Sequence, residues 1–402
     1  MTITRRTILK ACAAFGGLYV AAPMINRGRF QVFAQDKAEY STRALDLVAG
    51  ALVIDMLSAL GVVAKRGDVW LSKPGGFTST DAEAIRASGV TVFHWAGVTA
   101  GSKAREHAYQ DLARLNSLIL YHDEHLMRID SADDLALAKR NGKAGILLGM
   151  QNSEHFENVD DVDAFWMLGQ RVSQLTYNDS NRLGSGGMAW FDKGLTEYGL
   201  AIVERMNKVG MTVDLSHCAD RTTLDAIEAS TKPVAITHSN ARALNPGYPR
   251  CKTDEAIRKM AAKGGVMGLT VMRAFVRDKD PTTTEHWLDH VDHIAKLVGV
   301  EHVGIGTDAD VTTSSPKEEM AWYDTLPAKI KKFYRFRTGF GIDGLDHPKR
   351  IYDITEGLLR RGYSDADIRA ILGLNFRRLL SETWSQQIGH NHRIQPSGYT
   401  SG

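Results

Sequence analysis

Eight short apolar segments recur along the chain, and most of them end beside a polar residue. Their cores are nearly all apolar, which is typical of parallel strands whose two faces are both buried. We therefore predict eight strands, at residues 51–55, 90–94, 144–150, 172–176, 211–215, 234–237, 265–271 and 302–306.

Segments with helical periodicity lie between most of these strands. Several begin at Asp, Ser or Thr and end at Gly, as helices with favourable caps do. The predicted helices are 81–87, 103–118, 132–140, 162–168, 197–208, 221–229, 254–262 and 284–297. Strands that alternate with helices form parallel βαβ units, and eight such units predict a closed (β/α)8 TIM barrel of the α/β class.

The chain is longer than a minimal barrel of roughly 250 residues, which leaves room for a C-terminal helical extension. Residues 317–334 and 335–347 are aromatic and charged without clear periodicity, so we expect a loop or cap near the barrel mouth. Residues 352–361 and 365–384 are predicted to be helices. The polar residues 387–402 are expected to form a flexible tail.

The N-terminus has the pattern of an export signal. Arg5 and Arg6 precede an apolar stretch at 11–24, and Val32-Phe33-Ala34 offers a small-residue cleavage site. We predict a twin-arginine signal peptide at 1–34, a single domain at 35–386, and a periplasmic protein that depends on the twin-arginine export machinery. No later segment is long and apolar enough to span a membrane.

Charge and cysteine content exclude other classes of protein. The net charge is only +2 and both signs are mixed along the chain, so no basic patch indicates nucleic-acid binding. Of the three cysteines, only Cys218 and Cys251 follow the predicted signal, too few for a disulfide framework. We expect both to be ordinary buried residues, although one bridge remains open.

Two histidines and an aspartate stand where predicted strands end. His217 follows the strand 211–215, His238 follows 234–237, and Asp308 follows 302–306. Side chains at the carboxyl ends of barrel strands meet at one mouth. Imidazoles suit zinc, and a carboxylate beside a metal-bound water suits proton transfer, so the set predicts a metal-dependent hydrolase. A lone histidine would more simply be a core residue, but two at matching positions favour a metal site.

Several motifs, in the same order over the mature chain, resemble the renal (membrane) dipeptidase family, the M19 peptidases. They are Gln174-Leu-Thr-Tyr177-Asn178, Asp214-Leu-Ser-His217, Pro233-Val-Ala-Ile-Thr-His238-Ser239, Gly304-Ile-Gly-Thr-Asp308 and Leu374-Asn-Phe-Arg-Arg378. The resemblance implies an amidohydrolase-type barrel that holds two zinc ions and hydrolyses dipeptides with a free carboxylate. It also allows a homodimer.

Residue by residue, the resemblance implies that His217 and His238 bind the second zinc and that Asp308 handles a proton during the attack. Arg250 falls within a residue of the arginine that grips the substrate carboxylate, a task that suits a guanidinium fork. A solvated loop arginine is an equal alternative for Arg250.

Three departures from the family pattern point to one zinc ion or none. Asp55-Met-Leu-Ser-Ala59 stands where the family has Asp-Gly-His-Asn-Asp, so two ligands of the first zinc are missing. Gln151 replaces the bridging Glu, and Tyr177 replaces a histidine that polarises the scissile carbonyl. We expect at most one zinc, at Gln151, His217 and His238. Asp55 or His94 could substitute for a ligand, although Asp55 is better suited to orienting backbone.

The leading hypothesis is an exported dipeptidase-like metallohydrolase that cleaves a dipeptide or related amide. Tyr177 would donate to the oxyanion, and Asp308 would act as the base. Two alternatives remain, because one fold hosts many functions. One is a tailoring enzyme for an exported peptide metabolite. The other is an inactive, dipeptidase-like binding protein that keeps the pocket and Arg250.

Overall fold

The computed structural model describes residues 39–58, 66–72, 75–311 and 316–384. The chain divides into two compact units, residues 1–42 and 43–402, and the fold below is that of the larger unit. The predicted signal peptide and the tail at 387–402 lie outside the described residues.

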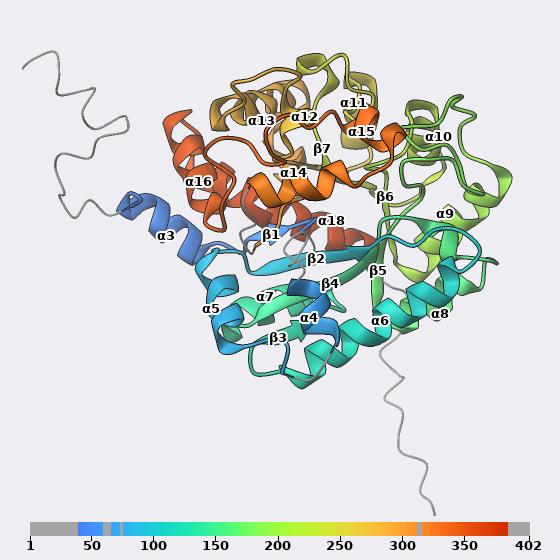
Figure 1. Ribbon diagram of the computed structural model, residues 1–402, viewed down its shortest axis with the longest axis horizontal. Coiled ribbons are helices and arrows are strands. Elements are labelled where there is room, and N and C mark those ends of the chain that lie inside the picture. The colour runs from blue at the N-terminus through green and yellow to red at the C-terminus, as the bar shows by residue number, and fades with distance from the viewer. Residues whose placement is uncertain (1–38, 59–65, 73–74, 312–315, 385–402) are drawn as a thin grey trace, which may run out of the picture. The chain divides into compact units, whose positions relative to one another are not determined.

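Eight parallel strands close into a barrel, as the alternation of strands and helices predicts (Figure 1). Closure follows from the pairing of β1 with both β2 and β9, and of β2 with β4. The eight strands are β1 (Ile54–Asp55), β2 (Val92–Gly97), β4 (Ala144–Met150), β5 (Gln170–Gln174), β6 (Thr212–Asp214), β7 (Ala235–Ser239), β8 (Val266–Leu269) and β9 (Val303–Ile305). All eight predicted strands are confirmed, most with bounds shifted by a few residues.

A ninth strand, β3 (Leu126–Arg128), was not predicted. It pairs with residues 144–146 of β4, while β5 pairs with residues 148–150 of the same strand. Three residues, of which only Leu126 is buried, give no recognisable apolar run. The sequence pattern therefore contains no signal for this strand.

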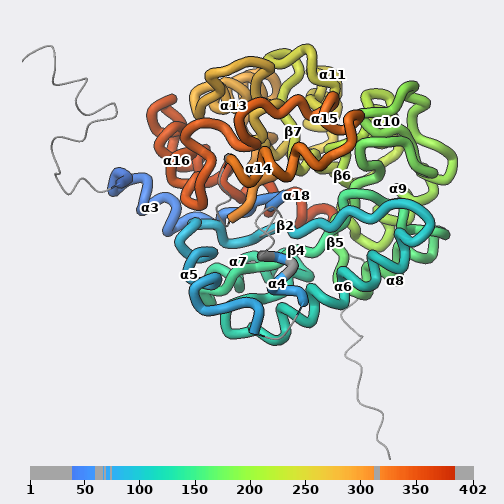
Figure 2. The backbone as a smooth tube through the Cα atoms, viewed as in Figure 1, coloured from blue at the N-terminus to red at the C-terminus, as the bar shows by residue number. Residues whose placement is uncertain are grey.

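Helices surround the strands (Figure 2). The helices that precede the C-terminal region are α3 (Thr42–Gly50), α4 (Arg66–Ser72), α5 (Ser79–Ala87), α6 (Ala104–Tyr121), α7 (Ala132–Asn141), α8 (Asp161–Met167), α9 (Glu197–Val209), α10 (Asp220–Ala229), α11 (Asp254–Ala262), α12 (Arg273–Val276) and α13 (Thr284–Val298). Local chemistry fixes their ends. Helix α7, for example, begins with a capping box of Ser131 and Asp134 and ends at Gly142, which adopts the left-handed conformation.

The C-terminal helices follow, and the last of them covers the amino-terminal end of the barrel. They are α16 (Arg350–Arg360), α17 (Asp365–Arg369), a π-helical segment (Ala370–Leu374) and α18 (Asn375–Trp384). Phe376 and Leu379 of α18 join the buried cluster that contains Val172 and Val266 of the strands. The Trp384 indole donates to the hydroxyl of Thr212, the first residue of β6, at 3.0 Å. The predicted helical extension is therefore confirmed.

Residues 317–334, expected to form a loop or cap near the barrel mouth, lie mostly in two helices, α14 (Pro316–Asp324) and α15 (Ala328–Tyr334). The expectation of a loop was wrong here because α14 has only a weakly one-sided apolar face. Aromatic packing stabilises the segment, since Tyr323, Phe336 and Phe340 form a buried cluster with Tyr248 and Phe275. Both helices lie on the side of the barrel that carries the predicted site residues.

None of the helices in the described part of the chain combines the length and apolarity needed to cross a membrane. Cys218 and Cys251 are both buried and free.

Candidate functional site

His217 and His238 meet at the carboxyl ends of β6 and β7. The strands hold them in register, since the Leu215 amide donates to the Ala235 carbonyl at 2.9 Å and the His238 amide to the Ser216 hydroxyl at 3.0 Å. Both imidazoles are buried, and their Nε2 atoms lie 3.0 Å apart. The structure thus brings together the two histidines that the sequence singled out.

The other nitrogen of each ring faces an acceptor. His217 Nδ1 lies 2.8 Å from Asn178 Oδ1, and His238 Nδ1 lies 2.8 Å from Thr237 Oγ1. The Thr237 hydroxyl donates to the Asp214 carboxylate at 2.8 Å, so it accepts from His238. Both rings therefore carry their proton on Nδ1, and their two Nε2 lone pairs point at each other.

The surroundings keep both imidazoles neutral. Burial lowers the pKa of His217 and His238 well below the ordinary value, and the charge of Arg250 lowers both further. Two lone pairs 3.0 Å apart repel each other unless a cation lies between them. Neutral imidazoles with converging Nε2 atoms suit a zinc ion, so this pair fits one such ion.

Further ligands are scarce near the pair. Across the described ranges, no three His, Cys, Asp or Glu side chains gather closely enough to hold a metal ion. Leu57 is buried and offers no ligand atom, and Ala59 lies outside the described residues. The side-chain amide of Gln151, just after β4, donates to the Ala96 carbonyl at 3.2 Å, which leaves Gln151 only its Oε1 as a ligand.

Arg250 is not a solvated loop arginine, and that alternative was wrong. Only 1% of the residue is exposed, and its guanidinium lies 5.2 Å from the Phe275 ring centroid. Its Nη atoms donate to the carbonyls of Ser216 and His238, the latter at 3.0 Å, while its Nε has no partner. A buried guanidinium with unused donor capacity beside both histidines fits a carboxylate.

Asp308 adopts a left-handed conformation, with a φ of 55°. Its amide donates to the Leu57 carbonyl at 2.9 Å, which fixes the turn after β9. Burial raises the pKa of the Asp308 carboxyl to about 7; Arg250 lowers it, and Asp55 raises it. A carboxyl with a pKa near neutrality can both accept and return a proton.

Asp55 serves the backbone. Its carboxylate accepts from the Thr307 amide at 2.8 Å, the Thr307 hydroxyl at 2.5 Å and the Leu57 amide at 3.3 Å. Burial raises its pKa to about 6, which the Thr307 bonds and Arg350 partly offset. Through these contacts Asp55 orients the backbone and does not act as a metal ligand.

Tyr177 lies directly on His217, with ring centroids 4.2 Å apart and planes 23° apart. Its hydroxyl interacts with that of Tyr334, and burial followed by this interaction raises the Tyr177 pKa well above its ordinary value. The hydroxyl expected to donate to an oxyanion is thus already engaged inside the protein.

The sequence did not identify three residues that surround the histidine pair, and it indicated only part of the environment of a fourth, His94. Asn178 orients His217, Tyr334 contacts Asn178 from 156 residues away, and Lys252 is buried with its charge acting on both histidines. Only Asn178 carried a signal, because it follows Tyr177 in the family motif. His94 is buried with its Nδ1 2.6 Å from the Met56 carbonyl, and its Nε2 has no partner.

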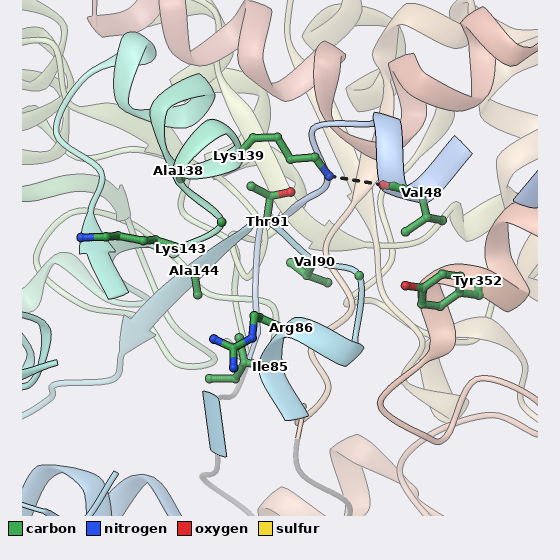
Figure 3. Close-up of a pocket in the computed structure, with 13 residues that line it drawn as sticks. Val48, Ile85, Arg86, Val90, Thr91, Ala138, Lys139, Lys143, Ala144 and Tyr352 are labelled. Carbon is green, nitrogen blue, oxygen red and sulfur yellow. Dashed lines mark hydrogen bonds between the residues drawn. The ribbon is translucent and has the colours of Figure 1, made fainter. Parts of the chain in front are cut away.

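A pocket of about 240 Å³ lies at the opposite end of the barrel, where Thr91 precedes β2 and Ala144 begins β4 (Figure 3). Lys139 reaches across it and donates to the Val48 carbonyl at 3.4 Å. None of its lining residues belongs to the histidine site.

Residues 43–335, well over half of the chain, match the model of the membrane dipeptidase family, peptidase family M19. An uncharacterised dipeptidase of Schizosaccharomyces pombe is 33% identical over 225 residues, which cover 53% of each chain. The dipeptidase verJ of Clonostachys rogersoniana is 29% identical, over 67% of this chain and 63% of its own length. The chain spans 53–63% of the length of the curated relatives it matches.

A crystal structure of an amidohydrolase from Pseudomonas aeruginosa is similar throughout the barrel. It has a TM-score of 0.72 and 28% identity, covering 85% of this chain and 99% of that protein. The barrel is therefore of the amidohydrolase type. The matched M19 family consists of zinc metallopeptidases. With its barrel, its histidine pair and the family match together, the chain belongs to the membrane dipeptidase family, M19.

Proposed function

We propose that this chain is an exported hydrolase that cleaves a dipeptide or related amide with a single zinc ion. The observation that carries the proposal is the pair of Nε2 lone pairs of His217 and His238, which converge at 3.0 Å. The dipeptidases among its relatives support the substrate class. The relatives extend beyond the matched region.

The limit of one ion rests on the surrounding residues. Leu57 offers no ligand atom, and the amide of Gln151 offers one neutral oxygen in place of a bridging carboxylate. We assign the ion to His217 and His238, with Gln151 Oε1 as the third protein ligand. When bound, zinc supplies a Lewis acid that polarises the scissile carbonyl and makes water more acidic.

The chain's own residues perform the remaining tasks. Arg250 binds the free carboxylate of the substrate, because it is buried and retains donor capacity. Asp308 accepts the proton of the attacking water and delivers it to the leaving amine, as its pKa of about 7 permits. Burial of the set excludes bulk water and strengthens each of these interactions.

Export is part of the same proposal. The Arg5-Arg6 pattern, the apolar stretch at 11–24 and Val32-Phe33-Ala34 support transport by the twin-arginine route to the periplasm. That route carries folded proteins, so the zinc would be loaded in the cytoplasm.

Metal content and turnover test the proposal together. Protein recovered after export should contain about one zinc per chain, because a catalytic ion needs about three protein ligands. It should release amino acids from unblocked dipeptides more slowly than a two-zinc enzyme. His217→Ala should remove both the zinc and the turnover. The matched control is His293→Ala, which deletes an outer histidine bonded to Asp254 at 2.9 Å and should change neither.

Two tightly held zinc ions would refute the one-ion assignment. Unchanged turnover in His217→Ala would refute the metal site itself.

A further inference from the structure

Tyr334, the last residue of α15, is held rigidly over the mouth of the barrel. Its ring stacks between Phe275, with centroids 6.1 Å apart at 8°, and Phe336, with centroids 5.4 Å apart at 10°. The Tyr248 hydroxyl donates to its carbonyl at 3.4 Å. An ion pair of 2.5 Å between Lys329 and Asp179 ties the same helix to the loop after β5.

The Tyr334 hydroxyl acts as an acceptor toward Asn178. Asn178 Nδ2 donates to it at 2.9 Å. Burial raises the pKa of both Tyr177 and Tyr334, whose hydroxyls interact with each other. Within the described residues, the Tyr334 hydroxyl donates no hydrogen bond of its own, so its proton has no acceptor there.

This unused donor lies beside the histidine pair. Asn178 contacts Tyr334 through Nδ2 and His217 Nδ1 through Oδ1, so one amide separates the hydroxyl from the imidazole. Tyr177, its second neighbour, stacks on His217 at 4.2 Å. Arg250 and Asp308 are close enough to act on the Tyr334 hydroxyl electrostatically. The free proton is therefore available where substrate would bind.

We propose that Tyr334 is a catalytic residue that donates a hydrogen bond to the oxyanion formed from the scissile carbonyl. The inference rests on the proposed hydrolysis. No bond to Tyr334 forms or breaks: the carbonyl oxygen gains negative charge as water adds to the carbon, and the tyrosine keeps its proton. A hydroxyl that itself accepts a hydrogen bond is a stronger donor, and one fixed in advance needs no reorganisation.

The test compares three single-hydroxyl deletions in the zinc-loaded full chain. Tyr334→Phe keeps both ring stacks and should lower kcat by about 10²–10³-fold with little change in KM, the usual effect of losing an oxyanion donor. Tyr177→Phe should cost less, at most about tenfold, since its hydroxyl interacts with that of Tyr334 and does not itself bind the oxyanion. Tyr323→Phe is the matched control, because its hydroxyl on α14 donates to the Lys331 carbonyl at 2.6 Å and should not affect turnover.

Binding provides a readout that does not depend on turnover. A phosphinate dipeptide analogue, whose tetrahedral P–O⁻ replaces the scissile carbonyl, should bind Tyr334→Phe at least about tenfold more weakly by calorimetry. A product amino acid should bind both proteins equally.

Different results would overturn the role of Tyr334 and the hydrolase assignment. If wild-type protein cleaves dipeptides but Tyr334→Phe retains full kcat and phosphinate affinity, the role of Tyr334 is overturned and the hydrolase assignment stands. A larger loss in Tyr177→Phe than in Tyr334→Phe would return the donor role to Tyr177. Equal losses in Tyr323→Phe and Tyr334→Phe would show that only the packing of α14 and α15 matters, which also overturns the proposal. Wild-type protein that neither cleaves dipeptides nor binds the phosphinate would overturn both.

Discussion

Replacing Asp308 by Asn tests the proton-transfer step with little risk to the fold. Asn has nearly the same shape and tolerates the φ of 55° that Asp308 adopts, whereas Ala would be strained there. The amide of residue 308 would still donate to the Leu57 carbonyl, because that bond uses only the backbone. The variant therefore removes a carboxylate and leaves the turn after β9 in place.

The expected loss of activity follows from the role of Asp308 as the general base. A positioned general base contributes about 10²–10⁴-fold to the rate, so kcat/KM of Asp308→Asn should fall by that factor. The wild-type profile should also depend on pH. The carboxylate is the active form, so activity is present above its pKa of about 7 and falls about tenfold per unit below it. A bound cation lowers this pKa, so the acid limb should have its midpoint at or below about 7.

The assay is the release of free amino acid from an unblocked dipeptide across this pH range. Asp163→Asn is the matched control: it removes a carboxylate paired with Arg205 at 2.5 Å on α8, outside the site, and should leave the profile unchanged. The reasoning is refuted if Asp308→Asn keeps more than about a tenth of the wild-type rate. It is also refuted if the acid limb survives unchanged in the variant.

Three further predictions concern export, acid stability and the substrate carboxylate. Changing Arg5 and Arg6 together to Lys should leave the precursor in the cytoplasm, and an unchanged periplasmic yield in cell fractionation would contradict this. Burial lowers the pKa of His155 to about 4, below the ordinary value of about 6.5. Above about pH 6.5, His155 is neutral in both the folded and the unfolded chain and does not reduce the free energy of unfolding. Below that pH the unfolded chain binds a proton that the folded protein does not, so the free energy of unfolding falls by about 3 kcal/mol between about pH 6.5 and about pH 4. Urea unfolding of His155→Gln should show a correspondingly smaller loss across this range. Finally, a dipeptide amide should have a KM at least about tenfold above that of the free acid, because Arg250 loses a charged partner; equal KM values would argue against that contact.

The sequence predicted the barrel because each strand carries its own evidence. Residues 144–150, for instance, are apolar throughout and flanked by helical segments, and all seven are buried in β4. The two histidines could be placed for the same reason, since the carboxyl ends of parallel strands share one mouth. These inferences need only local patterns and one rule of topology.

The contacts around the histidines could not be predicted in this way. Tyr334 meets Asn178 across 156 residues, and the segment that carries it has no clear apolar period. Arg250 could be matched to a motif, but its burial depends on the Phe275 ring and on the carbonyls of His238 in β7 and of Ser216 just after β6. Such pairs form only when distant segments pack together, so a single sequence contains no pattern that specifies them.

Two buried cations determine what the site can attract. In the described part of the chain, Arg250 donates to carbonyl oxygens, and Lys252 donates to the Cys218 carbonyl at 2.7 Å and a hydroxyl, so neither bonds to a carboxylate. After burial, their charges help to lower the pKa of both histidines and so keep protons off the converging Nε2 atoms. The positive charges of Arg250 and Lys252 also repel a zinc ion that is held only by neutral ligands. The site therefore needs negative charge close to the ion. In the proposed hydrolase, Asp308 would supply part of it and an anionic substrate would supply the rest. Substrate and metal should therefore bind cooperatively, which favours a dipeptide with a free carboxylate over a neutral amide.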